Sequence, residues 1–124
     1  MHINVFNKGE MFRDFTYIDD ITKGIELITK THPNFNTFDS NKPQSDISNA
    51  PYSIYNIGNG SSVKLNECIN ILESVLNKKA KRNDLPMQLG DVLSTKASLK
   101  KLYSTTGFKP NTNLKSGIKK FVEW

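Results

Sequence analysis

Residues 13–20 hold the densest group of side chains that could do chemistry, with the sequence Arg-Asp-Phe-Thr-Tyr-Ile-Asp-Asp. Arg13 carries a planar guanidinium, whose fork of donors suits phosphate or carboxylate oxygens. Asp19 and Asp20 come just before an apolar periodic run, where a helix is expected to begin and its dipole favours negative charge. The block therefore predicts an anion-binding cation followed by the start of a helix.

Other kinds of catalytic or metal site have little support. Asp19 and Asp20 diverge by about 100° if both lie on a helix, so joint binding of one metal ion is not favoured. His2 and His32 are far apart in the sequence, and neither has a partner at metal-ligand spacing. Cys68 lies within an apolar helical stripe, which is typical of a buried core thiol. We therefore expect no metal site and no catalytic nucleophile.

The sequence also lacks the patterns of a dinucleotide cofactor site. Such a site needs a strand, a glycine-rich turn and a helix whose N-terminus receives the pyrophosphate. Residues 58–60, Gly-Asn-Gly, form the only candidate turn, and the third glycine is missing. None of the four tyrosines is followed by a lysine four residues later. We therefore expect neither catalytic residues nor cofactor-binding residues in this chain.

Length and composition indicate one small domain spanning residues 1–124, with 36% hydrophobic and 23% charged residues. No apolar run approaches the roughly 20 residues that cross a bilayer, and the N-terminus lacks the pattern of a signal peptide. We therefore expect a cytoplasmic protein without membrane contact. The single cysteine excludes an internal disulfide framework.

The net charge of +5 would suit an acidic partner, but the lysines are scattered. The densest cluster, residues 78–82, follows a helical pattern, and cations suit the C-terminal end of a helix dipole. No aromatic residues are interleaved with this cluster, as they would be in many nucleic-acid sites. We interpret the cluster as a helix end and expect no nucleic-acid binding.

In the first half of the chain, residues 3–6 are predicted to form a short strand and residues 15–17 a second extended piece. Apolar residues at helical spacing then predict a helix over about residues 19–30, with Asp19 or Asp20 as its cap. Residues 32–51 are polar and rich in turn residues. They predict a long surface loop that is mobile at its middle.

In the second half, residues 52–57 favour a strand, and an apolar stripe predicts a helix from Leu65 to about Lys79. Residues 86–92 are irregular. Two further helices are predicted, one capped by Ser98 and ended by Gly107, and one beginning near Thr112 or Asn113 with Leu114, Ile118, Phe121 and Val122 facing inward. These elements predict an α+β fold with few short strands and about four helices, without a Rossmann sheet.

Several segments resemble, in order, the C-terminal part of extended short-chain dehydrogenase/reductases, and especially the UDP-glucuronate 4-epimerases of capsule and surface-polysaccharide pathways. The matching segments are residues 5–21, 55–59, 87–92, 107–110 and 117–124. The combination of Arg-Asp-Phe-Thr-Tyr with Gln-x-Gly-Asp-Val is more specific for the epimerase group than either motif alone.

The resemblance implies one half of a divided enzyme. In the family, a larger N-terminal Rossmann lobe binds NAD and supplies a Ser/Thr and a Tyr-x-x-x-Lys, which serve oxidation and re-reduction of the sugar 4-hydroxyl. The C-terminal part closes over the nucleotide sugar. This chain matches only the C-terminal part. The resemblance therefore implies a UDP-sugar-binding lobe that is inactive alone and whose missing partner is the Rossmann lobe.

Three residues match the family's contacts to the UDP moiety. By this resemblance, Arg13 would contact the diphosphate, Gln88 would lie beside the same phosphates, and Asp91 would accept hydrogen bonds from the ribose hydroxyls. Asp14 and Tyr17 are expected to be framework residues that satisfy local backbone groups and packing.

Alternatives stay open at this point. Arg13 would pair with Asp14 or Asp20 in a simple surface ion pair, and Asp91 would form a turn with the preceding glycine. The chain would then be a non-catalytic binding or interaction module. The equivalent lobe of a nucleotide-sugar dehydratase or reductase is a further alternative. A lobe built to pack on a Rossmann domain would expose apolar surface, which predicts self-association or a poorly ordered N-terminal segment and 32–51 loop.

Overall fold

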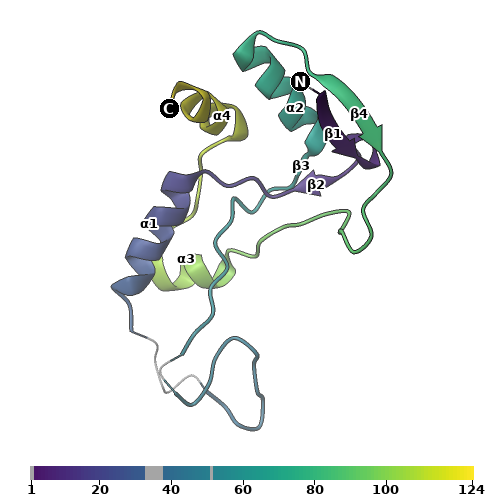
Figure 1. Ribbon diagram of the computed structural model, residues 1–124. Coiled ribbons are helices and arrows are strands. Elements are labelled where there is room, and N and C mark those ends of the chain that lie inside the picture. The colour runs from purple at the N-terminus through teal and green to yellow at the C-terminus, as the bar shows by residue number, and fades with distance from the viewer. Residues whose placement is uncertain (1, 33–37, 51) are drawn as a thin grey trace.

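The computed structural model describes residues 2–32, 38–50 and 52–124 of the chain. Within these residues the fold is α+β, with four α-helices and two small two-stranded sheets, as predicted (Figure 1). The strands are β1 (His2–Phe6), β2 (Phe12–Arg13), β3 (Val63–Lys64) and β4 (Lys81–Leu85). The helices are α1 (Ile18–Thr29), α2 (Leu65–Leu76), α3 (Lys100–Thr106) and α4 (Leu114–Glu123). No Rossmann sheet is present in this described part of the chain.

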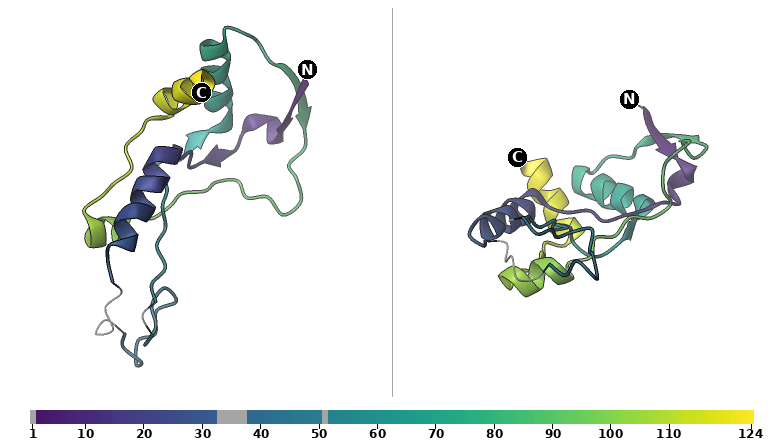
Figure 2. Two further views of the ribbon diagram at one scale, coloured as in Figure 1. Left: turned by 60° about the vertical axis from the view of Figure 1, so that its left-hand side comes forward. Right: turned by 90° about the horizontal axis from the view of Figure 1, so that it is seen from below.

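The helices pack in two pairs rather than around one sheet. Helix α2 lies against α4 near the β1–β4 sheet, and α1 lies against α3 at the other end of the molecule (Figure 2). The largest fully buried side chains are Leu102 of α3 and Val5 of β1, together with Pro110. Cys68 and Ile118 are also buried, as predicted, whereas Phe121 is 66% exposed, so its predicted inward position is wrong. None of the described helices is long and apolar enough to cross a membrane.

Strand β4 was missed because its sequence is almost entirely polar. It pairs in parallel with β1, with His2 opposite Lys81 and Phe6 opposite Leu85. Helix α2 ends at Leu76 because Asn77 takes the left-handed conformation, with φ of 50°. The basic cluster therefore does not extend the helix, and its last two residues begin a strand instead.

The predicted strand over residues 52–57 is wrong. Only a single bridge forms there, between Ile47 and Ser53. These β-favouring residues find no partner strand for a continuous ladder. Residues 33–37 and 51 of the predicted 32–51 loop lie outside the described residues. The described part of that loop is tied to α3, because Asp46 Oδ2 lies 2.6 Å from Lys101 Nζ.

Helix α1 begins at Ile18 without the predicted aspartate cap. Its N-cap residue is Tyr17, whose side chain makes no capping hydrogen bond. Asp20 is buried instead, and its Oδ2 accepts a hydrogen bond of 3.0 Å from the Thr112 N–H. Because the first turn of α1 faces the chain leading into α4, this carboxylate joins two elements rather than capping one.

The ends of the last two helices follow local chemistry more closely. Helix α3 ends at Gly107, whose φ of 69° suits glycine, as predicted. Its N-cap is Leu99 without a side-chain bond, so the predicted cap by Ser98 is wrong. Helix α4 is capped by Asn113, whose side-chain oxygen accepts a 2.9 Å hydrogen bond from the Ser116 N–H.

Candidate functional site

Strand β2 is the element that assembles the candidate site. One edge pairs with β3, and the other runs beside residues 91–95. On that second edge, Phe12 N donates to the Leu93 carbonyl at 2.9 Å, and Thr95 N donates to the Phe12 carbonyl at 3.1 Å. These backbone bonds bring together two segments that are about 80 residues apart in the sequence.

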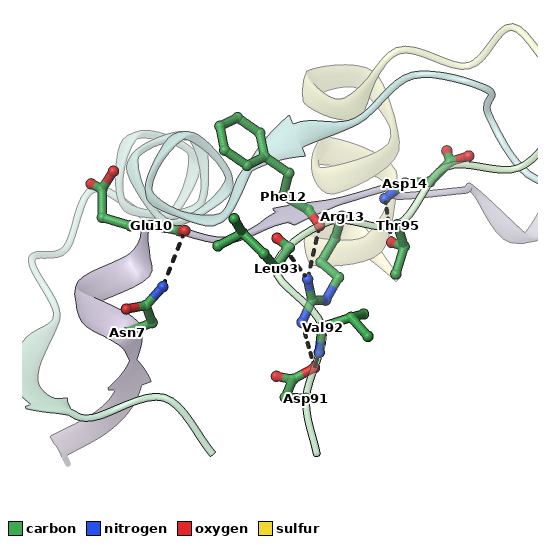
Figure 3. Close-up of polar contacts among 9 residues, drawn as sticks. All are labelled: Asn7, Glu10, Phe12, Arg13, Asp14, Asp91, Val92, Leu93 and Thr95. Carbon is green, nitrogen blue, oxygen red and sulfur yellow. Dashed lines mark hydrogen bonds and ion pairs between the residues drawn. The ribbon is translucent and has the colours of Figure 1, made fainter. Parts of the chain in front are cut away.

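Arg13 pairs with Asp91 in the structure. Its Nη2 lies 2.7 Å from Asp91 Oδ1, and the two side chains are 24% and 30% exposed (Figure 3). Its Nη1 donates to the carbonyls of Phe12 at 2.8 Å and Leu93 at 3.4 Å. The alternative ion pairs with Asp14 or Asp20 do not form. Two of the three residues predicted to bind UDP are therefore in direct contact.

Asp14 lies next to Arg13 in the chain but points away from it (Figure 3). Its carboxylate accepts hydrogen bonds from the N–H groups of Asn59 at 2.9 Å, Gly60 at 3.0 Å and Ala97 at 2.9 Å. Asp14 is thus a framework residue, as predicted. Two backbone donors of the glycine-rich turn are therefore occupied by this carboxylate.

Gln88 is the third residue predicted to bind UDP, and its side chain is exposed. Only its carbonyl contributes to the local structure, by accepting a 3.2 Å hydrogen bond from Asp91 N. Asp91 Oδ1 also accepts a 2.7 Å hydrogen bond from Val92 N. The turn role considered for Asp91 therefore coexists with its ion pair to Arg13.

Two contributors to the site were not predicted. The Leu93 carbonyl helps to orient the Arg13 guanidinium, and Thr95 Oγ1 accepts a 3.2 Å hydrogen bond from Asp14 N. A backbone carbonyl has no signature in a sequence. Thr95 lies three residues after the Gln-x-Gly-Asp-Val segment, and that proximity was the only signal.

Tyr17 has a packing role on the other side of the same segment. Its ring lies so close to α4 that a Cβ at Gly117 would sit 3.3 Å from it. Lys120 Nζ lies 4.9 Å from the ring centroid, a cation–π distance. These contacts confirm the expected framework role of Tyr17.

Metal and nucleophile chemistry gain no support from the described residues. Among residues 2–32, 38–50 and 52–124, no cluster of His, Cys, Asp and Glu side chains could hold a metal ion. Burial raises the pKa of the Cys68 thiol, which disfavours the reactive thiolate.

The chain was compared with protein families, with curated proteins and with solved structures. No protein-family model matches it. The chain is 42% identical to Protein CapI of Staphylococcus aureus, over 98% of this chain and 37% of that protein. It is also 42% identical to UDP-glucuronate 4-epimerase 1 of Arabidopsis thaliana, over 95% of this chain and 27% of that protein.

A solved structure agrees with these sequence matches. It is the UDP-glucuronic acid 4-epimerase of Bacillus cereus in complex with UDP-glucuronic acid and NAD, with a TM-score of 0.75 and 25% identity. The match covers 96% of this chain and 33% of the epimerase. The chain is therefore similar, in sequence and in fold, to nucleotide-sugar epimerases of the extended short-chain dehydrogenase/reductases. It corresponds to the C-terminal part of these proteins and spans about a third of their length.

The chain carries an apolar groove along residues 15–18, which follow Arg13 in the sequence. The groove has a volume of about 330 Å³ and lies between the start of α1 and helices α2 and α4. Phe15, Tyr17, Leu72 and Phe121 are among its lining residues. Ile18 also lines it and is 60% exposed. Such an exposed apolar surface is typical of a contact site for another protein segment.

Proposed function

We propose that this chain is the substrate-binding lobe of an NAD-dependent nucleotide-sugar 4-epimerase that serves surface-polysaccharide biosynthesis. The substrate class is a UDP-hexose or UDP-hexuronate. One observation carries the proposal. Arg13 and Asp91, which match the family's contacts to UDP, lie 2.7 Å apart although 78 residues separate them in the sequence.

The chemistry of the two side chains suits a nucleoside diphosphate. A guanidinium donates to diphosphate oxygens in a fixed fork, and a carboxylate accepts hydrogen bonds from two neighbouring hydroxyl groups. We assign Arg13 to the diphosphate and Asp91 to the ribose diol. Gln88 lies in the same turn as Asp91, and its exposed amide is available as a weaker donor to the phosphates.

We assign the catalytic reaction to the part of the proposed enzyme that lies outside this chain. In a 4-epimerase, NAD accepts a hydride from the sugar and returns it. The only glycine-rich turn in this chain holds Asp14, and the catalytic Tyr-x-x-x-Lys pattern is missing from its sequence. The chain alone is therefore inactive in this proposal, and its role is to bind and orient the substrate.

The partner of this lobe is the N-terminal Rossmann lobe. The relatives are about three times as long as this chain, so about two thirds of their length lies outside it. The apolar groove between α1, α2 and α4 is a surface on which such a lobe would pack. Without that partner, the exposed groove favours self-association.

The test is a titration of the chain with UDP, followed by calorimetry or by NMR shifts. We expect weak binding, at micromolar to millimolar UDP, that Arg13→Ala abolishes. Arg82→Ala is the matched control, because Arg82 is a partly exposed arginine that pairs with Asp84 in the β1–β4 sheet. Equal losses in both variants, or no binding by the wild-type chain at millimolar UDP, would contradict the assigned site.

A non-catalytic binding module is the second candidate, favoured by the missing catalytic pattern. An activity assay distinguishes the two candidate functions. The chain is mixed with the N-terminal lobe of a relative, and interconversion of UDP-glucuronate and UDP-galacturonate is measured. NAD-dependent interconversion by the mixture supports the epimerase. UDP binding without turnover by the mixture supports the binding module. With UDP-glucose as the substrate, a 4-keto-6-deoxy or reduced product would instead assign the lobe to a dehydratase or reductase.

A further inference from the structure

Although lysines occur along the whole chain, its excess of positive charge comes from residues 92–122. That stretch contains seven of the 17 basic side chains and none of the 12 acidic ones, so the rest of the chain carries a small net negative charge. Such an asymmetry indicates a surface that attracts anions. Lys101 Nζ lies 2.6 Å from Asp46 Oδ2. Lys120 Nζ lies 3.8 Å from Asp19 Oδ2. The other five lysines of the stretch form no ion pair among the residues that the structure describes.

Three of those five lysines surround one hollow in the surface. The hollow has a volume of about 560 Å³ and is lined by Lys96, Lys100 and Lys109, together with Tyr103. The three lysines are exposed, and Tyr103 is 59% exposed. No acidic side chain is among the described residues that line the hollow. Because like charges around one hollow repel one another, a bound anion would remove that repulsion.

Backbone hydrogen bonds fix the floor of this hollow. Gly60 and Ala97 line it, and their N–H groups donate to the Asp14 carboxylate at 3.0 and 2.9 Å. Lys96 directly precedes Ala97, so its backbone is positioned by the same carboxylate. Asp14 lies behind this floor, where it accepts three backbone hydrogen bonds and does not line the hollow. The charge that the hollow presents to a ligand is therefore that of its lysines.

The walls and charges of the hollow suit a compact ligand with several phosphate groups. Ala97 and Leu99 supply apolar walls, and apolar walls beside charges of one sign focus the electric field. A lysine ammonium binds phosphate as a point charge. The volume lies in the range of roughly 300–1,000 Å³ that is usual for small-molecule sites. A nucleic-acid strand would instead need cations along a track with several aromatic side chains, and one aromatic ring lines this hollow in the described part of the chain.

We propose that this hollow binds a small compound with three or more linked phosphate groups, either an inorganic polyphosphate or a nucleoside triphosphate. The three ammonium groups match the charge of a triphosphate chain. In a nucleotide, the base would stack on the exposed ring of Tyr103. The inference goes beyond the proposed function and does not depend on it, because no residue of the hollow forms a hydrogen bond with the side chain of Arg13 or Asp91.

The experiment titrates the chain with sodium tripolyphosphate, without divalent cations and at one ionic strength, and follows backbone NMR shifts. We expect saturable shifts near Lys96, Lys100 and Tyr103. The double variant Lys96→Gln with Lys100→Gln should bind about tenfold more weakly or worse, as for the loss of charged hydrogen bonds. The matched control is Lys115→Gln with Lys119→Gln, which removes the same charge from exposed lysines of α4 outside the hollow. It should change the affinity by less than about twofold, because salt screens distant charges.

A second titration with ATP distinguishes the two sources of the phosphate chain. Tighter binding of ATP than of tripolyphosphate, with the difference removed by Tyr103→Leu, would identify a nucleotide as the ligand. Equal affinities would identify an inorganic polyphosphate.

Several outcomes would overturn the proposal. Equal losses in the two double variants would show only a general attraction to the basic stretch. Shifts confined to Arg13 and Asp91 would place the phosphates at the candidate UDP site. Tighter binding of oligothymidylate, with shifts spread along residues 92–122, would assign the stretch to nucleic acid. Absence of saturable binding at millimolar tripolyphosphate would leave the hollow without this role. In each case, UDP binding that is lost in Arg13→Ala would leave the proposed function standing.

Discussion

Two regions of this lobe are stabilised in contrasting ways. The β2 junction, made of residues 12–14, 58–60 and 91–97, depends on side chains that bond to distant backbone groups. The β1–β4 sheet depends on backbone pairing over five residue pairs, and four of the five residues of β4 are exposed. A single side chain therefore matters more in the junction than in the sheet.

The comparison also separates stability from function within the junction. Asp14 and Arg13 are adjacent, but Asp14 satisfies three backbone donors, whereas Arg13 pairs with one partly exposed carboxylate. The first arrangement stabilises the fold. The second leaves donors for a ligand. Substitutions in the junction, and one in the connection from α2 to β4, should separate these roles, from the largest expected effect to the smallest.

The largest effect is expected from Asp14→Ala. It leaves three backbone N–H groups of residues 59, 60 and 97 without an acceptor, and each unsatisfied donor costs about 1–3 kcal/mol. We expect the free energy of unfolding to fall by about 3–5 kcal/mol, measured by urea denaturation and circular dichroism. Asp84→Ala in β4 is the control and should change it by less than about 0.5 kcal/mol. Equal losses in the two variants would remove the contrast between junction and sheet.

A smaller loss is expected from Gly58→Ala, which tests how closely the junction is packed. A Cβ at this position would lie 2.5 Å from the Ala97 side chain and 2.9 Å from Asp14 Oδ2. We expect a loss of about 1–3 kcal/mol from this crowding, measured by the same denaturation. Gly90→Ala is the comparison, because Gly90 has open space around it and a φ of 82°. It should lose only about 1 kcal/mol, from backbone strain alone.

The connection from α2 to β4 should respond to pH. Glu73 accepts from Lys79 Nζ at 2.6 Å and from Ala80 N at 2.9 Å, and the Lys79 hydrogen bond is the main cause of its lowered pKa. A carboxylate with a lowered pKa in the folded state stabilises the protein above its ordinary pKa of 4.5, and the contribution is lost as pH falls. We therefore expect Glu73→Gln to be less stable than the wild-type chain near neutral pH.

The measurement is thermal unfolding between about pH 7 and pH 3, over which the Glu73 contribution disappears. The stability difference between Glu73→Gln and the wild-type chain should shrink toward the acid end. Glu26→Gln is a second variant for the same measurement. Glu26 is exposed, and hydrogen bonds from Lys30 and Lys23 lower its pKa to about 2. A difference for Glu73→Gln that stays constant with pH would show that the carboxylate charge does not hold this connection.

The smallest effect on stability is expected from Arg13→Ala. Its ion pair with Asp91 is partly exposed, and such pairs contribute about 0–1 kcal/mol. We expect a loss below about 1 kcal/mol together with loss of UDP binding. A loss comparable to that of Asp14→Ala would show that Arg13 is a structural residue, and the contrast between the two neighbours would fail.

Local patterns predicted much of the helical content. The apolar stripe of α2, the left-handed Gly107 and the Asn113 cap all depend on residues within one or two turns of each other. The strands were predicted less well, because a strand needs a partner. Residues 52–57 have strand-like composition but no ladder, whereas β4 has a polar sequence and pairs with β1 along its full length.

The helix starts show the same limit. Asp20 and Ser98 were predicted as caps from their residue types, but Asp20 bonds to Thr112, 92 residues away, and α3 begins after Leu99. A carboxylate can satisfy any nearby backbone donor, and only packing determines which donor is nearby. The sequence therefore predicted the bonding capacity of these residues but not their partners.

The sequence by itself determined that Arg13 can bind an anionic oxygen. It also placed three carboxylates, those of residues 14, 19 and 20, close to Arg13 in the chain. The tertiary structure decided that its partner is Asp91, because backbone bonds of Phe12 to Leu93 and Thr95 hold this segment beside β2. The adjacent carboxylate is directed away, since successive side chains on an extended backbone point to opposite sides. That geometry turns Asp14 into a structural acceptor and leaves Arg13 and Asp91 together at the surface, where a nucleotide could satisfy both.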